Sequence, residues 1–312
     1  MIESGNERGL LRFVADHLFA RPSLPTPVRP HDRATLTSET MHATTADPDV
    51  RASQRPGWIV AFVNQKGGVG KTTSTVNIAA SLAARGDHVL VVDIDPQGNA
   101  TSSLGIDKRD LDVTVYDALV GDVEPADAVI TNARERIDLL PATPTLAGAE
   151  VELVGQGRRE HRLADTLREL RHGYDVVLID SPPSLGLLTV NALTASTGVV
   201  IPVQCEYLAL EGVSQVLSTI DLIRRSLNPG LELLGVLMTM YDGRTRLSAH
   251  VVDEVRRFFP DHLFAAVIPR SVRLAEAPSF GQVISEYDPS SRGATAYAEV
   301  ATELRSRLAA TS

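Results

Sequence analysis

A nine-residue stretch, Gln65–Thr73, constrains this chain more than any other part of its sequence. It reads Gln-Lys-Gly-Gly-Val-Gly-Lys-Thr-Thr. An apolar run rich in β-forming residues, Trp58–Val63, precedes it, and a segment with helical apolar spacing, Ser74–Arg85, follows it. A strand, a glycine-rich loop and a helix in this order are the context that a phosphate-binding loop requires. We therefore expect a nucleoside triphosphate site here; an ordinary glycine-rich turn is the weaker alternative.

The residue types in this loop suit different parts of a triphosphate. Its glycines let successive backbone N–H groups turn toward a phosphate without obstruction by a Cβ atom. The N-terminus of the following helix adds partial positive charge, Lys71 adds a mobile full charge, and Thr72 offers a hydroxyl to Mg²⁺. The expected nucleotide-binding residues of the loop are Lys66, Gly67, Gly68, Val69, Gly70, Lys71, Thr72 and Thr73.

Two lysines in one phosphate loop need separate roles. Lys71, at the helix start, can serve the β- and γ-phosphates of its own nucleotide, whereas Lys66 sits on the outward shoulder of the loop. Gln65 stands where the standard motif has its first glycine. This form of the loop resembles the deviant Walker A loop of the ParA/MinD family of P-loop ATPases. The resemblance implies an ATP-dependent homodimer in which Lys66 crosses to the partner's phosphates, so that Lys66 and Lys71 both count as catalytic.

Composition limits the partners of this chain of 312 residues. The net charge of −9 means that any contact with nucleic acid must come from a local basic patch. One cysteine, Cys205, excludes an intrachain disulfide and a thiolate metal cluster within one chain, and it favours a reduced, cytoplasmic setting. No apolar run reaches membrane-spanning length, so we expect no integral membrane association.

Strand and helix patterns alternate from Trp58 onward, which predicts an α/β fold: a doubly wound, mostly parallel sheet with helices on both faces. We assign residues 57–312 to one P-loop ATPase domain, with ligands at the carboxyl ends of its strands. The expected strands are 58–63, 88–93, 137–140, 176–180, 198–203, 231–240 and 263–268, and the expected helices are 74–85, 163–170, 210–227, 245–259 and 294–309.

Residues 1–56 differ from the rest because six prolines punctuate a stretch rich in Thr, Ser, Arg and Asp. We expect a disordered arm. Within it, the apolar residues between Leu10 and Phe19 fit one face of a short helix that could dock on a partner or a membrane surface. The alternatives are a segment with no stable structure, or translation that starts at Met41 instead of Met1.

Three aspartates follow two apolar strands and should lie beside the loop. Asp93 and Asp95 belong to the segment Val-Asp-Ile-Asp-Pro-Gln-Gly-Asn, which resembles a signature of ParA proteins. That resemblance implies that Asp95 aligns the attacking water and that Asp93 helps to hold the Mg²⁺ shell. Asp180 ends the run Val176–Asp180 in the Walker B pattern, and we expect it to act on Mg²⁺ through a water molecule.

Two later segments, 240–246 and 268–279, closely match the chromosomal ParA/Soj branch. The match implies that Pro269 and Ser271 contact the nucleotide near its adenine, although many relatives have Asn where this chain has Ser271. It also implies that Arg244 and Arg273 bind DNA without sequence preference. The alternative for each arginine is an ordinary solvated surface charge.

Taken together, these motifs resemble those of a ParA-type partition ATPase acting on a chromosome or plasmid. The resemblance implies that such a protein binds ATP and Mg²⁺ and closes a sandwich dimer. The dimer binds the DNA of the nucleoid without sequence preference and is released when a ParB-family partner stimulates hydrolysis. The alternative is a MinD-like ATPase at a membrane surface, but the terminal sequence Glu-Leu-Arg-Ser-Arg-Leu-Ala-Ala-Thr-Ser offers little of the amphipathic helix it needs. Iron–sulfur carrier ATPases need cysteines that this chain lacks, and the Asp-Pro-Gln-Gly-Asn segment at 95–99 disfavours an amidotransferase-like synthetase.

Overall fold

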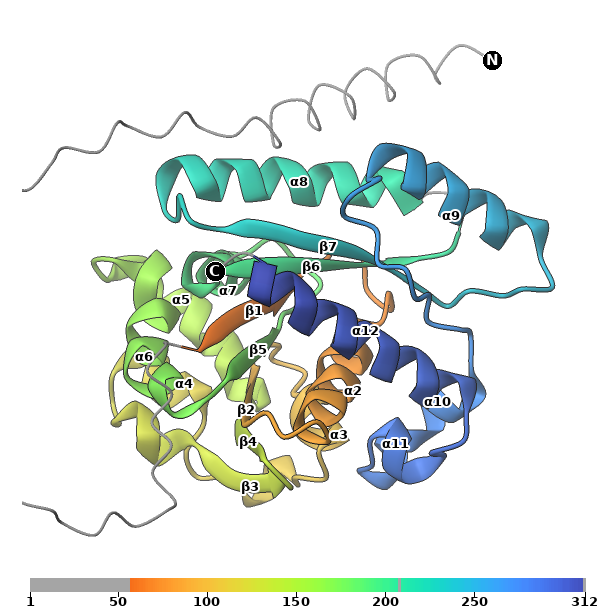
Figure 1. Cartoon of the computed structure of the whole chain (residues 1–312). Helices are drawn as coiled ribbons and strands as arrows, with labels where there is room; N and C mark the ends of the chain where they lie inside the picture. The colour runs from red at the N-terminus through yellow and green to blue at the C-terminus, as the bar shows by residue number, and fades with distance from the viewer. Residues whose placement is uncertain (1–56, 207–208, 311–312) are drawn as a thin grey trace, which may run out of the picture.

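The computed structural model describes residues 57–206 and 209–310, so the expected arm at 1–56 and its helix lie outside the described residues. The described part forms a seven-stranded sheet in the order β3-β4-β2-β5-β1-β6-β7 (Figure 1). All neighbouring strands are parallel except β3 and β4. The strands are β1 Trp58–Phe62, β2 Val89–Asp93, β3 Ile130–Arg134, β4 Ile137–Leu140, β5 Val176–Asp180, β6 Gly198–Gln204 and β7 Glu232–Thr239.

Helices cover both faces of this sheet. In Figure 1, α2 and α12 lie side by side, and both contribute to a core that also includes α3, α10 and α11. The helices from α4 to α9 supply the core on the opposite face. The helices are α2 Lys71–Ala83, α3 Asn99–Ser103, α4 Val115–Val120, α5 Ala149–Glu152, α6 Arg162–Leu170, α7 Leu187–Ala195, α8 Ala209–Ser226, α9 Arg246–Phe258, α10 Val272–Glu276, α11 Ile284–Tyr287 and α12 Arg292–Ala310.

The central strands are apolar throughout because both of their faces are buried. In β5, Val177 and Ile179 pack into the core with α4–α9, whereas Val176 and Leu178 pack into the core with α2 and α12. Alternate residues of a strand point to opposite faces, so a strand covered on both sides needs a continuous apolar run. The expected doubly wound, mostly parallel sheet is confirmed.

One expected strand is wrong. Residues 263–268 pair with β7 only at their ends, where Phe264 N–H donates to the carbonyl of Val236 (3.0 Å) and Ile268 N–H donates to the carbonyl of Met238 (2.9 Å). Between these points the N–H of Ala265 donates instead to the Glu303 carboxylate of α12 (2.9 Å). Four residue steps on this segment span two on β7, so the chain bulges away and forms one isolated bridge, between Leu263 and Val236, instead of a strand.

Strand register brings the functional segments to one level. Asp180 at the end of β5 is paired in register with Phe62 of β1 on one side and with Asp93 of β2 on the other. The loop after β1 and the carboxylates that end β2 and β5 therefore meet at the same edge. After β1 the chain continues to β2 on one side of this point, and after β5 it continues to β6 on the other side. Ligands bind at such a switch point in doubly wound folds.

Candidate nucleotide site

The glycine-rich loop ends where α2 begins, and its shape depends on two glycines. Gly68 (φ 74°) and Gly70 (φ 87°) both have left-handed backbone conformations that side chains disfavour, and Gly70 is the N-cap of α2. The hydroxyl of Thr239, at the end of β7, donates to the carbonyl of Val69 (2.8 Å) and fixes the loop tip. No acidic residue occupies the first turn of α2, so its N-terminus remains positive.

Lys71 is buried at this N-terminus, with only 6% of its surface exposed. Its Nζ donates to the carbonyl of Lys66 across the loop (3.2 Å). Burial lowers the pKa of Lys71 from its ordinary value, and the negative charges of Asp180 and Asp95 oppose that shift. A buried ammonium that faces carboxylates and open backbone N–H groups is well placed to receive an anion.

Asp180 is wholly buried and connects β5 to α2. The hydroxyl of Thr72 donates to its Oδ2 (2.6 Å), while its Oδ1 is buried without a hydrogen-bond partner among the described residues. Burial, and after it the charge of Asp93, raises the pKa of Asp180 well above the usual range. An unpaired carboxylate oxygen is costly inside a protein, and a cation bound at this position would offset that cost.

The other two aspartates hold the loop after β2 in place. Asp93 accepts hydrogen bonds from the N–H and hydroxyl of Thr101 (both 2.8 Å) and from the N–H of Asp95 (3.1 Å). Burial raises the pKa of Asp93 to about 6, although these bonds favour its charged form. Asp95 in turn accepts from the N–H of Gln97 (2.9 Å) and is 6% exposed.

A magnesium ion fits part of this arrangement. In residues 57–206 and 209–310 no group of three or more His, Cys, Asp or Glu side chains is arranged to hold a metal. Magnesium in phosphate sites instead uses one or two protein oxygens and completes its octahedron with phosphate and water. Thr72 and the free oxygen of Asp180 meet that need. Asp93 is committed to Thr101 and Asp95, so its expected place in the shell stays a prediction.

Lys66 points away from Lys71. Its side chain forms an ion pair with Glu206, just beyond the end of β6, and it is 48% exposed. Its backbone N–H donates to the side chain of Asn64 (3.0 Å), and Asn64 donates to the carbonyl of Pro202 (2.7 Å). The two lysines thus occupy the separate inner and outer positions that the sequence indicates.

The structure adds several residues that sequence reasoning left without a role: Asn64, Thr101, Glu206 and Thr239. Asn64 directly precedes the loop, so its position is a usable signal. The other three lie between 28 and 166 residues beyond the loop's last residue, Thr73, and no spacing in the sequence connects them to it.

The expected adenine segment lies beside the end of β7. The carbonyl of Ile268 accepts from the N–H of Tyr241 (2.9 Å), and Pro269 bridges to Tyr241. Ser271 is the N-cap of α10, but its side chain makes no capping hydrogen bond. Because β7 also fixes the loop tip through Thr239, this segment lies at the same edge of the sheet as the loop. Nucleotide contact by Pro269 and Ser271 stays a prediction.

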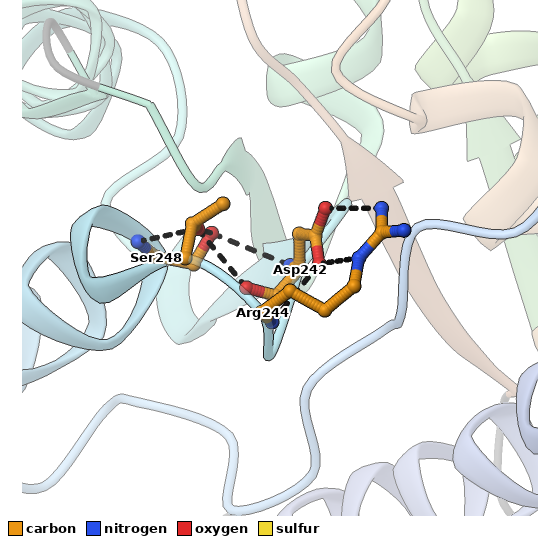
Figure 2. Close-up of polar contacts among 4 residues, drawn as sticks. Asp242, Arg244 and Ser248 are labelled. Carbon is orange, nitrogen blue, oxygen red and sulfur yellow. Dashed lines mark hydrogen bonds and ion pairs between the residues drawn. The ribbon is translucent and has the colours of Figure 1, made fainter.

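Both expected DNA-binding arginines are exposed and ion-paired within the chain. Figure 2 shows Arg244 folded back on Asp242, with its Nη2 2.7 Å from Oδ2 and its Nε 2.9 Å from Oδ1. Hydrogen bonds from Arg244 lower the pKa of Asp242 to about 2. Arg273 pairs with Glu276 (3.2 Å) and lies over the ring of Tyr287. Neither arginine is a bare positive charge.

A phosphate loop between β1 and α2, with aspartates at the ends of β2 and β5, defines a P-loop nucleotide-binding protein. The chain matches the family model described as AAA domain over residues 57–233. It is 56% identical to the sporulation initiation inhibitor protein Soj of Bacillus subtilis over 248 residues, which cover 80% of this chain and 98% of that protein. It is 50% identical to the chromosome partitioning protein ParA of Myxococcus xanthus, covering 80% and 89%. The chain belongs to the Soj/ParA family of chromosome-partitioning ATPases.

A solved structure with the same fold is that of cobyrinic acid a,c-diamide synthase from Mycobacterium smegmatis with bound ADP and magnesium. It is 43% identical, covers 81% of this chain and 96% of that chain, and superposes with a TM-score of 0.72. Among the residues described here, no helix combines the length and the apolar character needed to cross a bilayer.

We expect the buried Asp180 to destabilise the protein at neutral pH when no nucleotide is bound. Its folded-state pKa is raised, so its favourable contribution is complete below the unfolded pKa and is lost as pH rises. We expect Asp180→Asn to stabilise the protein relative to wild type more at pH 7.5 than at pH 4.5, because only the carboxylate loses stability as pH rises. Urea unfolding at the two pH values measures this difference. If the difference in unfolding free energy between Asp180→Asn and wild type is the same at both pH values, Asp180 is not an uncompensated buried carboxylate.

Proposed function

We propose that this chain is a ParA-type partition ATPase that binds ATP with Mg²⁺ and closes a sandwich homodimer. The dimer binds DNA without sequence preference and so associates with the nucleoid. Hydrolysis stimulated by a ParB-family partner then releases it. In this proposal residues 57–312 form the ATPase domain, and the same cycle applies whether the DNA is a chromosome or a plasmid.

The observation that carries the proposal is the division of labour between the two loop lysines. Lys71 is buried at the N-terminus of α2, while Lys66 is half-exposed on the outside of the loop. One nucleotide inside the loop needs only the buried ammonium. An exposed lysine on the same loop suits a second nucleotide presented by a facing subunit, and the family resemblance supports this assignment.

Magnesium would be held by the hydroxyl of Thr72 and, through a water molecule, by the unpaired oxygen of Asp180, and Asp93 would help to hold its shell. When bound, it would neutralise charge on the β- and γ-phosphates. Lys71 would hold those phosphates from the loop side. Asp95, whose negative charge opposes the lowering of the Lys71 pKa by burial, would orient the water that attacks the γ-phosphate.

Asp95 gives the first functional prediction. Removing a carboxylate that only orients water should slow hydrolysis by about 100-fold while nucleotide binding survives. We expect Asp95→Ala to bind ATP and to accumulate as an ATP-bound dimer. Phosphate release and sedimentation with ATP and Mg²⁺ measure both properties. Wild-type turnover by this variant would remove Asp95 from the catalytic role.

DNA binding by an acidic protein requires a local patch that a dimer doubles. Arg244 is 88% exposed and Arg273 is 58% exposed, on the loop before α9 and on α10 respectively. Each has carboxylates as its present partners, so DNA phosphates must replace them. This exchange predicts weak binding by a monomer and strong salt dependence for the dimer.

The proposed DNA surface predicts that two substitutions weaken DNA binding and that a third strengthens it. Arg244→Glu and Arg273→Glu should weaken ATP-dependent binding to unrelated duplexes alike, and each should reduce the slope of log affinity against log salt by about 1 per lost contact. Asp242→Asn, which releases Arg244, should strengthen binding. Arg168→Glu is the matched control, because Arg168 is equally ion-paired on α6.

Fluorescence anisotropy with duplexes of two sequences, with and without ATP over a salt series, provides the measurement. Unchanged affinity in both Arg244→Glu and Arg273→Glu, with normal dimerisation, would place the DNA surface elsewhere. Equal binding without ATP would contradict the need for a dimer.

A further inference from the structure

The side chain of Lys66 is not free to leave its subunit without cost, because Glu206 holds it. Glu206 follows β6 and precedes α8, so 140 residues of sequence separate the two partners. A second side-chain contact lies beside it, where Gln65 donates to Gln215 of α8. Both contacts hold side chains on the outer side of the phosphate loop against residues of the same chain.

The backbone of this shoulder is anchored independently of the ion pair. The N–H of Lys66 bonds to Asn64, and Asn64 bonds to the carbonyl of Pro202 in β6. Asn64 is 3% exposed, so this anchor belongs to the core. The Lys66 side chain can therefore swing from Glu206 to another anion while its Cα stays in place.

The ion pair is of a kind that can exchange. The Lys66 and Glu206 side chains are 48% and 34% exposed overall, although the paired Oε1 of Glu206 is itself covered. Ion pairs between partly exposed side chains are weak. Lys71, by contrast, is buried and cannot leave the loop. A triphosphate presented by a second subunit carries more negative charge than one carboxylate, so it can displace Glu206 from Lys66. ADP, which lacks the γ-phosphate, competes less well.

We propose that Glu206 is a positioning residue that holds Lys66 on its own subunit and thereby raises the ATP requirement for dimer formation. The inference rests on the proposed function, since it needs Lys66 to act across a dimer. Two Lys66–Glu206 ion pairs, one in each subunit, must break when a dimer forms, so the free-energy cost of breaking the pair applies twice. Because the partner's triphosphate must displace Glu206 from Lys66, dimer formation depends on the γ-phosphate.

The test is a double-mutant cycle on dimerisation, measured by sedimentation equilibrium with Mg²⁺ and a slowly hydrolysed ATP analogue. Glu206→Gln keeps the shape and removes the charge. We expect it to lower the dimer dissociation constant by about fivefold, because two exposed pairs no longer oppose association. In a Lys66→Ala background the same Glu206→Gln change should have no effect, since there is no amine to hold.

Glu299→Gln is the matched control, because it removes the same charge from an exposed position on α12. Weaker dimerisation by Glu206→Gln would overturn the inference, since Glu206 would then be presenting Lys66 to the partner. An equal gain in the Lys66→Ala background would also overturn it, as a general charge effect. If wild type forms no dimer with the analogue, the proposed function itself fails and the inference fails with it.

Discussion

Three carboxylates and one buried ammonium meet at the carboxyl edge of the sheet, and this imbalance of charge governs the site. Lys71 faces Asp95 and Asp180, while Asp93 lies in register beside Asp180. Burial raises the pKa of both strand-end aspartates, and one oxygen of Asp180 has no hydrogen-bond partner among the described residues. A fold that keeps such a group sacrifices stability for a ligand that brings its own cation.

The same principle extends to the outer charges. Lys66 is paired with Glu206, Arg244 with Asp242 and Arg273 with Glu276. Each of these basic residues is one that we assign to an external anion, either phosphate of a second nucleotide or phosphate of DNA. In the proposed function, assembly would exchange weak intramolecular ion pairs for contacts with phosphate, which would allow an acidic chain with a net charge of −9 to bind DNA or a second nucleotide.

Local sequence was enough to predict the phosphate loop, the strands that carry Asp93 and Asp180, and the parallel sheet. Each of these depends on an apolar run followed by a polar signal within a few residues. The strand expected at 263–268 failed because Glu303, almost forty residues later, takes the N–H of Ala265. The short antiparallel strand β3 was missed because its sequence, Ile-Thr-Asn-Ala-Arg, is mostly polar at the sheet edge.

The partners of the site residues were beyond prediction for a similar reason. Thr101 on Asp93, Thr239 on Val69 and Glu206 on Lys66 are contacts that only the folded chain creates. Their residue types are common, and nothing in their spacing marks them. Sequence motifs predicted the groups that we expect to face a nucleotide, whereas the groups that hold these in position required the structure.

The central claim is that the Gln65–Thr73 loop and Asp180 form one site for a triphosphate with magnesium. Calorimetric titration of ATP into wild type, Lys71→Ala and Thr72→Ala, each with and without Mg²⁺, tests it most directly. We predict that Mg²⁺ tightens ATP binding by wild type, that Thr72→Ala loses most of this gain, and that Lys71→Ala weakens binding by at least about 100-fold. ATP binding by Lys71→Ala with wild-type affinity and the same response to Mg²⁺ would contradict the account.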